Sequence, residues 1–310
     1  MDPRFSCGFL VCLLAVAVSQ LRASSQTVNH ELSGLFNDLW RLDLSRFTPG
    51  VDYNVTVQGK AGYVPQGSNN ARDHASSPLF SGVNEEKLTT TTTFSRLMKL
   101  LDNYERSTGV SERVTPDEVT ENNLFLDAVL ETEVMKRAHR YLVSKGVSSS
   151  NLVQFKTQLY TIWFRLYHRE RNGGEDSCGF EHVFVGETKH GSDIIGFHNW
   201  VQFYLQEKSS NLDYKGYKAR DVDLPDSDDH VLSLQFSWHG LLKPVGSTFI
   251  GASPEFEMAV YTVIFLINTQ RSTSVVVNID QCQLELVVVR RGRSLGTAYP
   301  KLLSSNRRHQ

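Results

Sequence analysis

The feature that most constrains the fold is a change of hydrophobic pattern at Asn172-Gly173-Gly174. Before this break, apolar residues recur at the spacing that is typical of amphipathic helices. After it, short runs rich in β-branched and aromatic residues are typical of strands. The pattern therefore predicts an α+β protein, in which a mostly helical N-terminal lobe, residues 26–170, is followed by a β-rich lobe of antiparallel sheets, residues 171–310.

Local patterns divide the first lobe into helices and one long loop. Helices are predicted over 31–43, 93–106 and 150–167, and a longer one over 116–146 with a break near Asn122-Asn123. The longer helix has the clearest start, because Thr115-Pro116-Asp117-Glu118 offers a capping threonine, a first-turn proline and a glutamate for a capping box. Residues 52–84 are rich in Gly, Asn, Ser and Pro, which predicts a long loop or an irregular crossing segment.

The second lobe is predicted to combine strands with two helices. The expected strands are 230–238, a continuation through Lys243 toward Ile250, 275–279 and 284–290, and the expected helices are 200–208 and 253–265. His239-Gly240 marks a turn, so His239 is interpreted as a turn residue. Tyr299 is expected on the last strand or at its exit.

Residues 1–25 are typical of a secretory signal peptide. Arg4 precedes an apolar run from Phe9 to Val18, and small residues follow at Ala23-Ser24-Ser25. This run is shorter than the roughly 18 apolar residues that a membrane-spanning helix needs, and no later run reaches that length. The mature protein is therefore expected to be secreted, with Asn54 of the sequon Asn54-Val55-Thr56 as a glycosylation site.

Export would leave Cys178 and Cys282 as the only cysteines of the mature chain, because Cys7 and Cys12 lie in the signal segment. In an oxidising compartment these two either pair as a disulfide or remain buried thiols. Their spacing does not match the Cys-x-x-Cys pattern of a zinc site.

Two histidines flank a polar, glycine-containing connector. The runs Gly179–Glu187 and Ile194–Trp200 are predicted as strands of a β-hairpin, and a turn near His190 places His182 opposite His198 on one sheet face. With unperturbed pKa values of about 6.5, one imidazole can accept a proton while the other donates one. Transesterification of RNA needs such a pair, with a cation for the charge that develops on the phosphate. Structural roles for both histidines are the alternative, and a register slip of one residue would separate them.

Four ordered blocks resemble the poly(U)-specific endoribonuclease family, EndoU. They are Gly179–Glu187, Gly196–Trp200, Lys243–Ser247 and Ser253–Glu257, and the similarity extends from about residue 30 to about residue 303. The resemblance implies one EndoU-like domain over residues 26–310. It also implies an endoribonuclease that cuts single-stranded RNA at uridines by attack of the 2′-OH and leaves 2′,3′-cyclic phosphate ends.

The resemblance implies catalytic roles for three side chains of these blocks. The family's catalytic histidines match His182 and His198, and its catalytic lysine matches Lys243. By analogy with distantly similar viral uridylate-specific enzymes, His198 is the base and His182 the acid. A lysine suits the third role, because its ammonium stays protonated beside a phosphate.

The resemblance also implies supporting residues around this centre. The family's uracil-reading serine falls on Ser247, and its stacking tyrosine falls on Tyr299. Glu181 and Glu187 match carboxylates that orient the histidines or affect the response to metal.

The formal net charge of −2 predicts no strong overall field toward RNA, so a binding groove depends on local charge. The candidate phosphate contacts are Arg290, Arg291, Arg293, Lys301, Arg307 and Arg308. The expected partner is single-stranded U-containing RNA, bound by a monomer that does not act on DNA.

An acidic loop is a candidate site for a stimulatory Mn²⁺ or Ca²⁺, which the chemical step itself does not require. Its carboxylates are Asp221, Asp223, Asp226, Asp228 and Asp229. Their spacing is not that of an EF-hand, and a solvated loop is the alternative interpretation.

Two other functions fit parts of the sequence. One is a secreted RNA-binding protein with vestigial catalysis. The other is a hydrolase with a nucleophilic Ser247, or with zinc bound by Glu181, His182, Glu187 and His190. The sequence has neither the His-Glu-x-x-His helix nor the Gly-x-Ser-x-Gly elbow that usually accompanies these sites.

Overall fold

Helix α8 (Pro254–Ile267) is the element around which the others pack. The computed structural model describes residues 27–65, 67–171, 173–218 and 230–305, and in it every residue from Pro254 to Phe265 is buried. A helix that is buried on all sides belongs in the middle of a core. The Ser253 hydroxyl caps its first turn by accepting from the backbone N–H of Phe256, and Pro254 follows at the first helical position. The helix predicted after Ser253 is confirmed.

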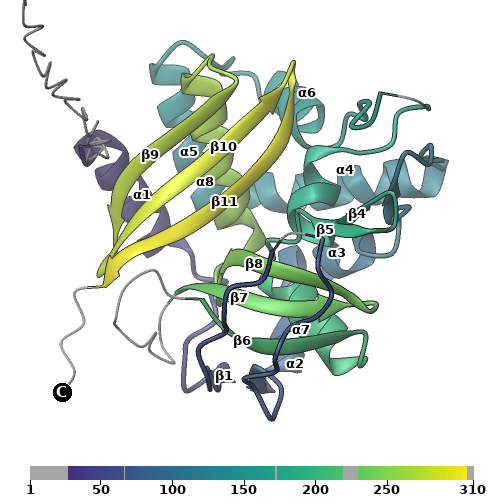
Figure 1. Cartoon of the computed structure of the whole chain (residues 1–310). Helices are drawn as coiled ribbons and strands as arrows, with labels where there is room; N and C mark the ends of the chain where they lie inside the picture. The colour runs from purple at the N-terminus through teal and green to yellow at the C-terminus, as the bar shows by residue number, and fades with distance from the viewer. Residues whose placement is uncertain (1–26, 66, 172, 219–229, 306–310) are drawn as a thin grey trace, which may run out of the picture.

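An antiparallel sheet covers one side of α8. Its strands are β9 (Ser272–Ile279), β10 (Cys282–Arg291) and β11 (Ser294–Ser305). Helix α1 (His30–Leu42) lies beside β9, and α5 (Glu133–Ser144) packs against α8 (Figure 1). Asn37 of α1 donates to the carbonyl of Asn278 at 2.7 Å. The two predicted strands of this region are confirmed, and Tyr299 lies on β11.

A second antiparallel sheet lies below the first in Figure 1. Its strands are β6 (Leu212–Tyr217), β7 (Val231–Trp238) and β8 (Leu241–Phe249), and helix α7 (Trp200–Lys208) packs on it. The ring of Phe203 on α7 lies 5.2 Å from that of Phe236 on β7. A β-bulge interrupts the pairing of β7 with β8, because Pro244 and Val245 lie opposite Gln235 alone. The predicted helix 200–208 and strand 230–238 are confirmed.

Three other helices of the first half are shorter than predicted, namely α3 (Thr92–Leu100), α4 (Pro116–Glu131) and α6 (Leu152–Trp163). A short helix, α2 (Glu85–Thr90), was not predicted. Helix α4 begins with the predicted capping box, in which both hydrogen bonds between Thr115 and Glu118 are present. The predicted break near Asn122-Asn123 is wrong, since both residues lie inside α4. The chain breaks at Thr132 instead, whose hydroxyl caps α5 by accepting from the N–H of Met135 at 3.2 Å.

Residues 52–84 form the predicted crossing segment, with the short strands β1 (Tyr53–Val55) and β2 (Phe80–Val83) near its ends. Between these strands the chain runs beside β6, where the N–H of Ala61 donates to the Tyr217 carbonyl at 2.9 Å. Further on, the Asn69 side chain accepts from the N–H of Leu242 at 3.0 Å. The segment therefore reaches from β6 across to β8.

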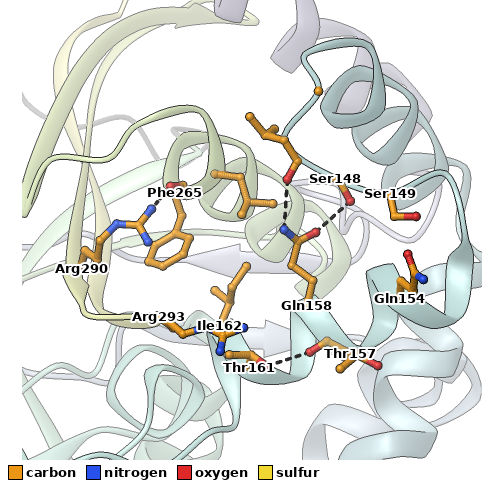
Figure 2. A pocket seen from close by; sticks show the side chains of 13 residues that line it. Ser148, Ser149, Gln154, Thr157, Gln158, Thr161, Ile162, Phe265, Arg290 and Arg293 are labelled. Atoms are coloured by element: carbon orange, nitrogen blue, oxygen red, sulfur yellow. Dashed lines mark hydrogen bonds between the residues drawn. The ribbon is translucent and has the colours of Figure 1, made fainter.

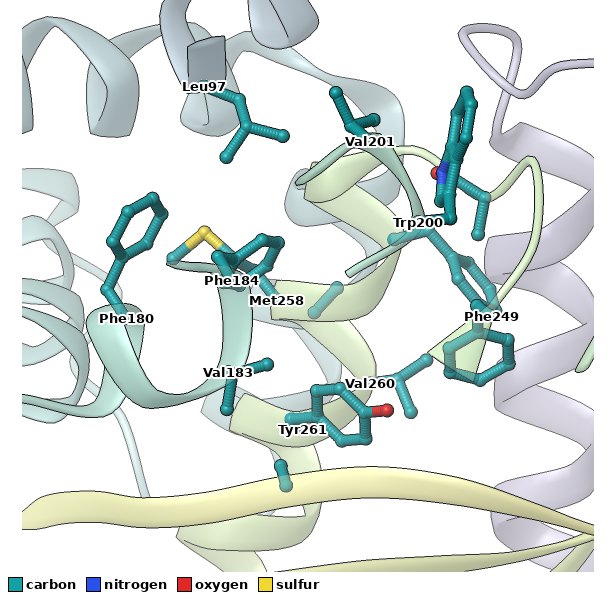
Figure 3. Packing of buried hydrophobic residues seen from close by; sticks show 14 of the residues in the cluster. Leu97, Phe180, Val183, Phe184, Trp200, Val201, Phe249, Met258, Val260 and Tyr261 are labelled. Carbon is teal, nitrogen blue, oxygen red and sulfur yellow. The ribbon is translucent and has the colours of Figure 1, made fainter. Parts of the chain in front are cut away.

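A continuous cluster of buried apolar residues joins the two halves of the sequence. Figure 3 shows Val183 and Phe184 beside Met258 and Tyr261 of α8, with Phe180 on the far side of Phe184 and with Leu97, Trp200 and Phe249 around them. Because both predicted lobes contribute to this cluster, the half that contains His182 and His198 is supported directly by helices of the first half.

The expectations about export have different outcomes. Residues 1–25 lie outside the described residues. Within the described part of the chain, no disulfide joins Cys178 to Cys282, and both side chains are buried. The structure therefore supports the alternative of two buried thiols and does not support a disulfide. No helix among the described residues is long and apolar enough to cross a membrane.

Candidate active site

His182 lies on a one-turn π-helix, η1 (Glu181–Val185), and not on a strand. The predicted hairpin exists, but it is shorter. Its strands are β4 (Glu187–Lys189) and β5 (Asp193–Ile195), so His182 precedes it and His198 follows it. The prediction was wrong because the buried run Val183-Phe184-Val185 has the composition of a strand, and a short buried run does not reveal its period.

The apolar side chains around η1 anchor it in the core. The rings of Phe180 and Phe184 stack with centroids 4.9 Å apart, and Phe180 also contacts the rings of Phe125 and Phe164, whereas Phe184 lies nearer to α8 (Figure 3). At Gly179 a Cβ atom would come within 2.8 Å of the Leu295 side chain on β11, so only glycine permits this close approach. The π-helix is thus held between α8 and β11, with the His182 backbone fixed in place.

The segment Gly196-Phe197-His198 packs directly on η1. The N–H of Phe197 donates to the His182 carbonyl, and the N–H of His198 donates to the Val183 carbonyl, both at 2.8 Å. Gly196 has a φ of 62°, and a Cβ atom there would lie 2.0 Å from the His182 carbonyl oxygen. This contact brings the imidazoles of His182 and His198 together, with ring centroids 6.2 Å apart.

The imidazole of His182 is held by charged side chains. Its Nδ1 contacts Oε2 of Glu187, and the same oxygen accepts from Nε of Arg169 at 3.1 Å. All three side chains are largely buried. Burial, together with the nearby cations Arg169, Lys243 and Arg291, holds the pKa of His182 well below its usual value. Its other ring nitrogen, Nε2, is left available for a substrate.

The imidazole of His198 is held by a backbone carbonyl and an aromatic ring. Nδ1 lies 2.9 Å from the carbonyl oxygen of Ser247 on β8. A carbonyl only accepts, so Nδ1 carries the hydrogen and the neutral ring has its lone pair on Nε2. Tyr299 of β11 stacks on the ring with centroids 5.0 Å apart. Burial and the neighbouring Lys243 and His182 hold the pKa of His198 well below its usual value.

Lys243 reaches the same place from β8. Its Nζ donates to the carbonyls of Gly196 at 2.8 Å and Ile194 at 3.3 Å, beside the His198 segment. Burial lowers the pKa of this ammonium to about 8. Two carbonyls use two of its three hydrogens, so one donor is left for an anion.

Ser247 and Tyr299 lie together where β8 meets β11. The Ser247 hydroxyl donates to the Pro300 carbonyl and lies 3.3 Å from the Ser233 hydroxyl on β7. Tyr299 is the residue before Pro300, and one face of its ring covers His198. The two residues that the sequence places at the uracil are therefore neighbours of the histidine pair.

Glu181 is arranged differently from Glu187. It is fully buried, and neither carboxyl oxygen has a hydrogen-bond partner among the described residues. Burial and the nearby carboxyls of Glu187 and Glu112 raise the pKa of Glu181 well above its usual value. Only Glu187 of the two motif carboxylates contacts a histidine side chain.

The metal alternatives gain no support from the described residues, which hold no group of three or more His, Cys, Asp or Glu side chains suited to a metal ion. His190, the fourth proposed zinc ligand, is exposed in the β4–β5 turn and pairs with Glu170 at 3.3 Å. The acidic loop from Asp221 to Asp229 lies outside the described residues.

The predicted basic contacts are spread over several places. Arg290 caps α8 by donating to the Phe265 carbonyl and to that of Asn268 at 2.8 Å. With Arg293 it lines a pocket of about 620 Å³ between α6 and the end of α8, where Figure 2 shows it against Phe265. Arg291 acts on the pKa of His182, as stated above. Lys301 pairs with Glu285 at 3.1 Å, and residues 307 and 308 lie outside the described residues.

Sequence reasoning missed Arg169, which pairs with Glu187 from the loop after α6. It also missed Gly196 as the contact that joins the two histidine segments. No local pattern marks Arg169, because the pairing joins residues far apart in the chain. Glycine at position 196 could have indicated a sharp turn, because glycine readily adopts the positive φ that Gly196 has here.

The chain is similar over most of its length to known endoribonucleases. A family model, Endoribonuclease XendoU, matches residues 31–300. The chain is 71% identical over 309 residues to Uridylate-specific endoribonuclease C of Danio rerio, covering 100% of both chains. It is 59% identical over 280 residues to Poly(U)-specific endoribonuclease of Xenopus tropicalis, covering 90% of this chain and 96% of that one.

A solved structure has the same fold. It is that of XendoU, a splicing-independent snoRNA-processing endoribonuclease, with a TM-score of 0.81 and 56% identity over 90% of this chain and 100% of that one. The α+β fold predicted from the sequence is thereby confirmed. The chain belongs to the XendoU family of endoribonucleases.

Proposed function

We propose that this protein cleaves single-stranded RNA on the 3′ side of uridylates and leaves a 2′,3′-cyclic phosphate. The 2′-oxygen forms a bond to phosphorus while the bond from phosphorus to the 5′-oxygen breaks. One proton leaves the 2′-OH and one proton is given to the 5′-oxygen. The observation that carries the proposal is the pair of imidazoles with centroids 6.2 Å apart, each with Nδ1 occupied by a different kind of partner.

His198 is assigned as the general base. Its Nδ1–H is directed to the Ser247 carbonyl, so Nε2 bears the lone pair that takes the 2′-OH proton. The lowered pKa keeps this ring neutral at neutral pH. A carbonyl partner favours the neutral tautomer without adding a full negative charge.

His182 is assigned as the general acid. Glu187 at Nδ1 holds the ring and leaves Nε2 for the substrate, and the negative charge of a bound phosphate favours the imidazolium form, which can then give the Nε2 proton to the 5′-oxygen. Arg169 keeps Glu187 in place and, after burial, is the largest influence that lowers the pKa of His182. The acid thus remains able to release its proton.

Lys243 is assigned to the charge that develops on the phosphoryl oxygens. A preorganised ammonium in a site shielded from water stabilises such charge more strongly than in bulk solvent. Its bond to the Gly196 carbonyl ties it to the His198 segment, so base and cation keep a fixed relation.

Ser247 and Tyr299 are assigned to the uracil. The Ser247 hydroxyl gives its hydrogen to the Pro300 carbonyl, so it can accept a hydrogen bond from an N–H at the edge of the base. One face of the Tyr299 ring is occupied by His198, and its other face can stack on the uracil. The relatives' printed names, uridylate-specific and poly(U)-specific endoribonuclease, support uridine as the base that is read.

The remaining expectations complete the proposal. The protein acts as a secreted monomer, and Asn54, an exposed residue of β1, carries the glycan. Mn²⁺ or Ca²⁺ strengthens RNA binding but takes no part in the proton transfers, which are all assigned to side chains.

Mass analysis of the products from a defined oligonucleotide tests the proposal. The substrate is a deoxyribonucleotide strand with a single ribouridine, and the control strand has 2′-deoxyuridine at that position. We expect one cut after the ribouridine, with a product lighter by one water than a 3′-phosphate, and no cut in the control. A chelator should change the rate at low substrate but leave the product the same. Cleavage of the control strand would overturn the assignment of the 2′-OH as nucleophile.

A further inference from the structure

The crossing segment passes over the second sheet beside the residues assigned to the uracil. The N–H of Ala61 and the carbonyl of Gly59 pair with Tyr217 of β6. The next carbonyl, that of Gly62, accepts from Nε2 of Gln235 at 3.2 Å, and the same nitrogen donates to the Pro244 carbonyl at 3.3 Å. Gly62 and Pro244 are therefore held side by side by one buried amide.

Each of the two bridged residues is followed by a residue with an exposed side chain. Tyr63 follows Gly62 and is 87% exposed, and Val245 follows Pro244 and is 52% exposed. Tyr63 makes no hydrogen bond or ring contact with any residue that the structure describes. A single exposed tyrosine would need no explanation. An exposed ring next to an exposed valine, fixed by a buried glutamine, is a small apolar surface.

The surface lies next to the proposed uracil site. Ser233 of β7 is opposite Ser247 of β8, and Gln235 follows Ser233 by two positions on the same face of the sheet. One step of two residues along a strand is about 6.6 Å, so the Gln235 bridge lies close to the Ser233–Ser247 pair. The bulge at Val245 lies between Lys243 and Ser247 and pushes this side chain outward.

A cation accompanies the surface. Nζ of Lys218 donates to the carbonyls of Gly62 at 2.7 Å and Ala61 at 3.3 Å. These bonds fix the backbone that precedes Tyr63, and they place a positive charge at Gly62, where it can attract the negatively charged backbone of a bound RNA strand.

We propose that Tyr63 and Val245 form a stacking surface for a nucleobase adjacent to the scissile uridine in the same RNA strand. The inference rests on the function proposed above, since it extends the substrate beyond the uridine. Every base has a flat face that can stack on an aromatic ring, so this site should bind any neighbouring base and favour longer RNA strands over shorter ones. Uridine is read at Ser247 and Tyr299, and its neighbour is held without being identified.

Cleavage kinetics of Tyr63→Ala and Tyr63→Phe test this surface. The first substrate has a single ribouridine with ordinary bases on both sides, and the second has abasic sites at both neighbouring positions. For the first, Tyr63→Ala should raise KM by about ten-fold, while Tyr63→Phe keeps the ring and stays near wild type. For the second, all three proteins should have the same KM. Two further substrates, each with one neighbour restored, identify the side on which the base stacks.

The matched control is Leu44→Ala, because Leu44 is equally exposed at 87% but lies outside the segments that line the site. It should leave both substrates unaffected. The inference is overturned if Tyr63→Ala raises KM equally for the abasic substrate, or if it changes neither. A failure of the proposed function looks different, because the wild-type protein would then not cleave after the ribouridine in any of these strands.

Discussion

The two histidines are held by regions of opposite character. Nδ1 of His182 contacts the carboxyl group of Glu187, which pairs with Arg169 and whose pKa burial raises to about 7. Nδ1 of His198 contacts a neutral backbone carbonyl on β8, and a tyrosine ring of β11 stacks on its imidazole, with the Lys243 ammonium nearby. Burial lowers both pKa values, so depth alone does not distinguish the rings. The difference lies in the Nδ1 partner, and it is the basis on which His182 is proposed as the acid and His198 as the base.

The largest effect should come from removing either ring. His182→Ala and His198→Ala should each lower kcat by about 10³-fold or more, because each loses a proton transfer. The two variants should then differ on a uridine 3′-phosphodiester whose leaving group, such as p-nitrophenolate, is easily expelled. His182→Ala should regain most of its activity, since such a group leaves without a proton, and His198→Ala should not. Single-turnover rates on both substrates measure this.

Lys243→Ala serves as the reference for this pair. It should lower the rate on both substrates, because the phosphoryl charge develops whatever group leaves. Circular dichroism should show an intact fold for all three variants. Recovery of His198→Ala instead of His182→Ala would exchange the two assignments.

The next effect concerns the contact that joins the regions. Gly196→Ala places a Cβ 2.0 Å from the His182 carbonyl at a φ of 62°, so the segment must move. We expect a loss of about 3 kcal/mol in unfolding free energy and at least about 100-fold in kcat. Gly191→Ala is the control, since its φ of 70° is similar but no atom lies within 4 Å. It should cost about 1 kcal/mol and leave kcat near wild type. Urea unfolding and steady-state rates distinguish them.

These contrasts also explain what the sequence could predict. Helix α7 and the start of α4 depend on local signals, an Asn199 cap and the capping box at Thr115, and both were predicted correctly. The break at Thr132 had a local signal too, a capping threonine before Glu133, but Asn122-Asn123 was preferred because paired asparagines often mark loops. Asn122 is instead buried inside α4, where tertiary packing overrides its low helix propensity.

For the site, the family resemblance located side chains but not the geometry around them. Nothing local distinguishes a π-helix from a strand in Val183-Phe184-Val185, and the pairing of Arg169 with Glu187 depends on how the chain folds back. The two histidines came together nonetheless, although the reason was the Gly196 contact and not a hairpin register.

A smaller effect should appear in the pH profile of kcat/KM. Activity should rise with pH as His198 loses its proton, and it should fall at higher pH as His182 loses its own. Because both pKa values are lowered, the rising and the falling limb of the profile should both lie below pH 6.5. Arg291→Gln removes a cation that lowers the pKa of His182, so the falling limb should move to higher pH. Shifts of the rising limb alone would contradict the assignment.

The smallest effect should come from changing Tyr299, whose ring stacks on His198. Tyr299→Phe keeps the ring that covers His198 and loses only the hydroxyl, so kcat/KM should stay within about three-fold of wild type. Tyr299→Ala removes the stacking surface and should cost about ten-fold or more. Because the ring touches His198 as well as the proposed uracil site, the preference for uridine over cytidine decides between two explanations. A ring that reads the base lowers this preference when lost, whereas a ring that only supports the imidazole lowers cleavage at both bases equally.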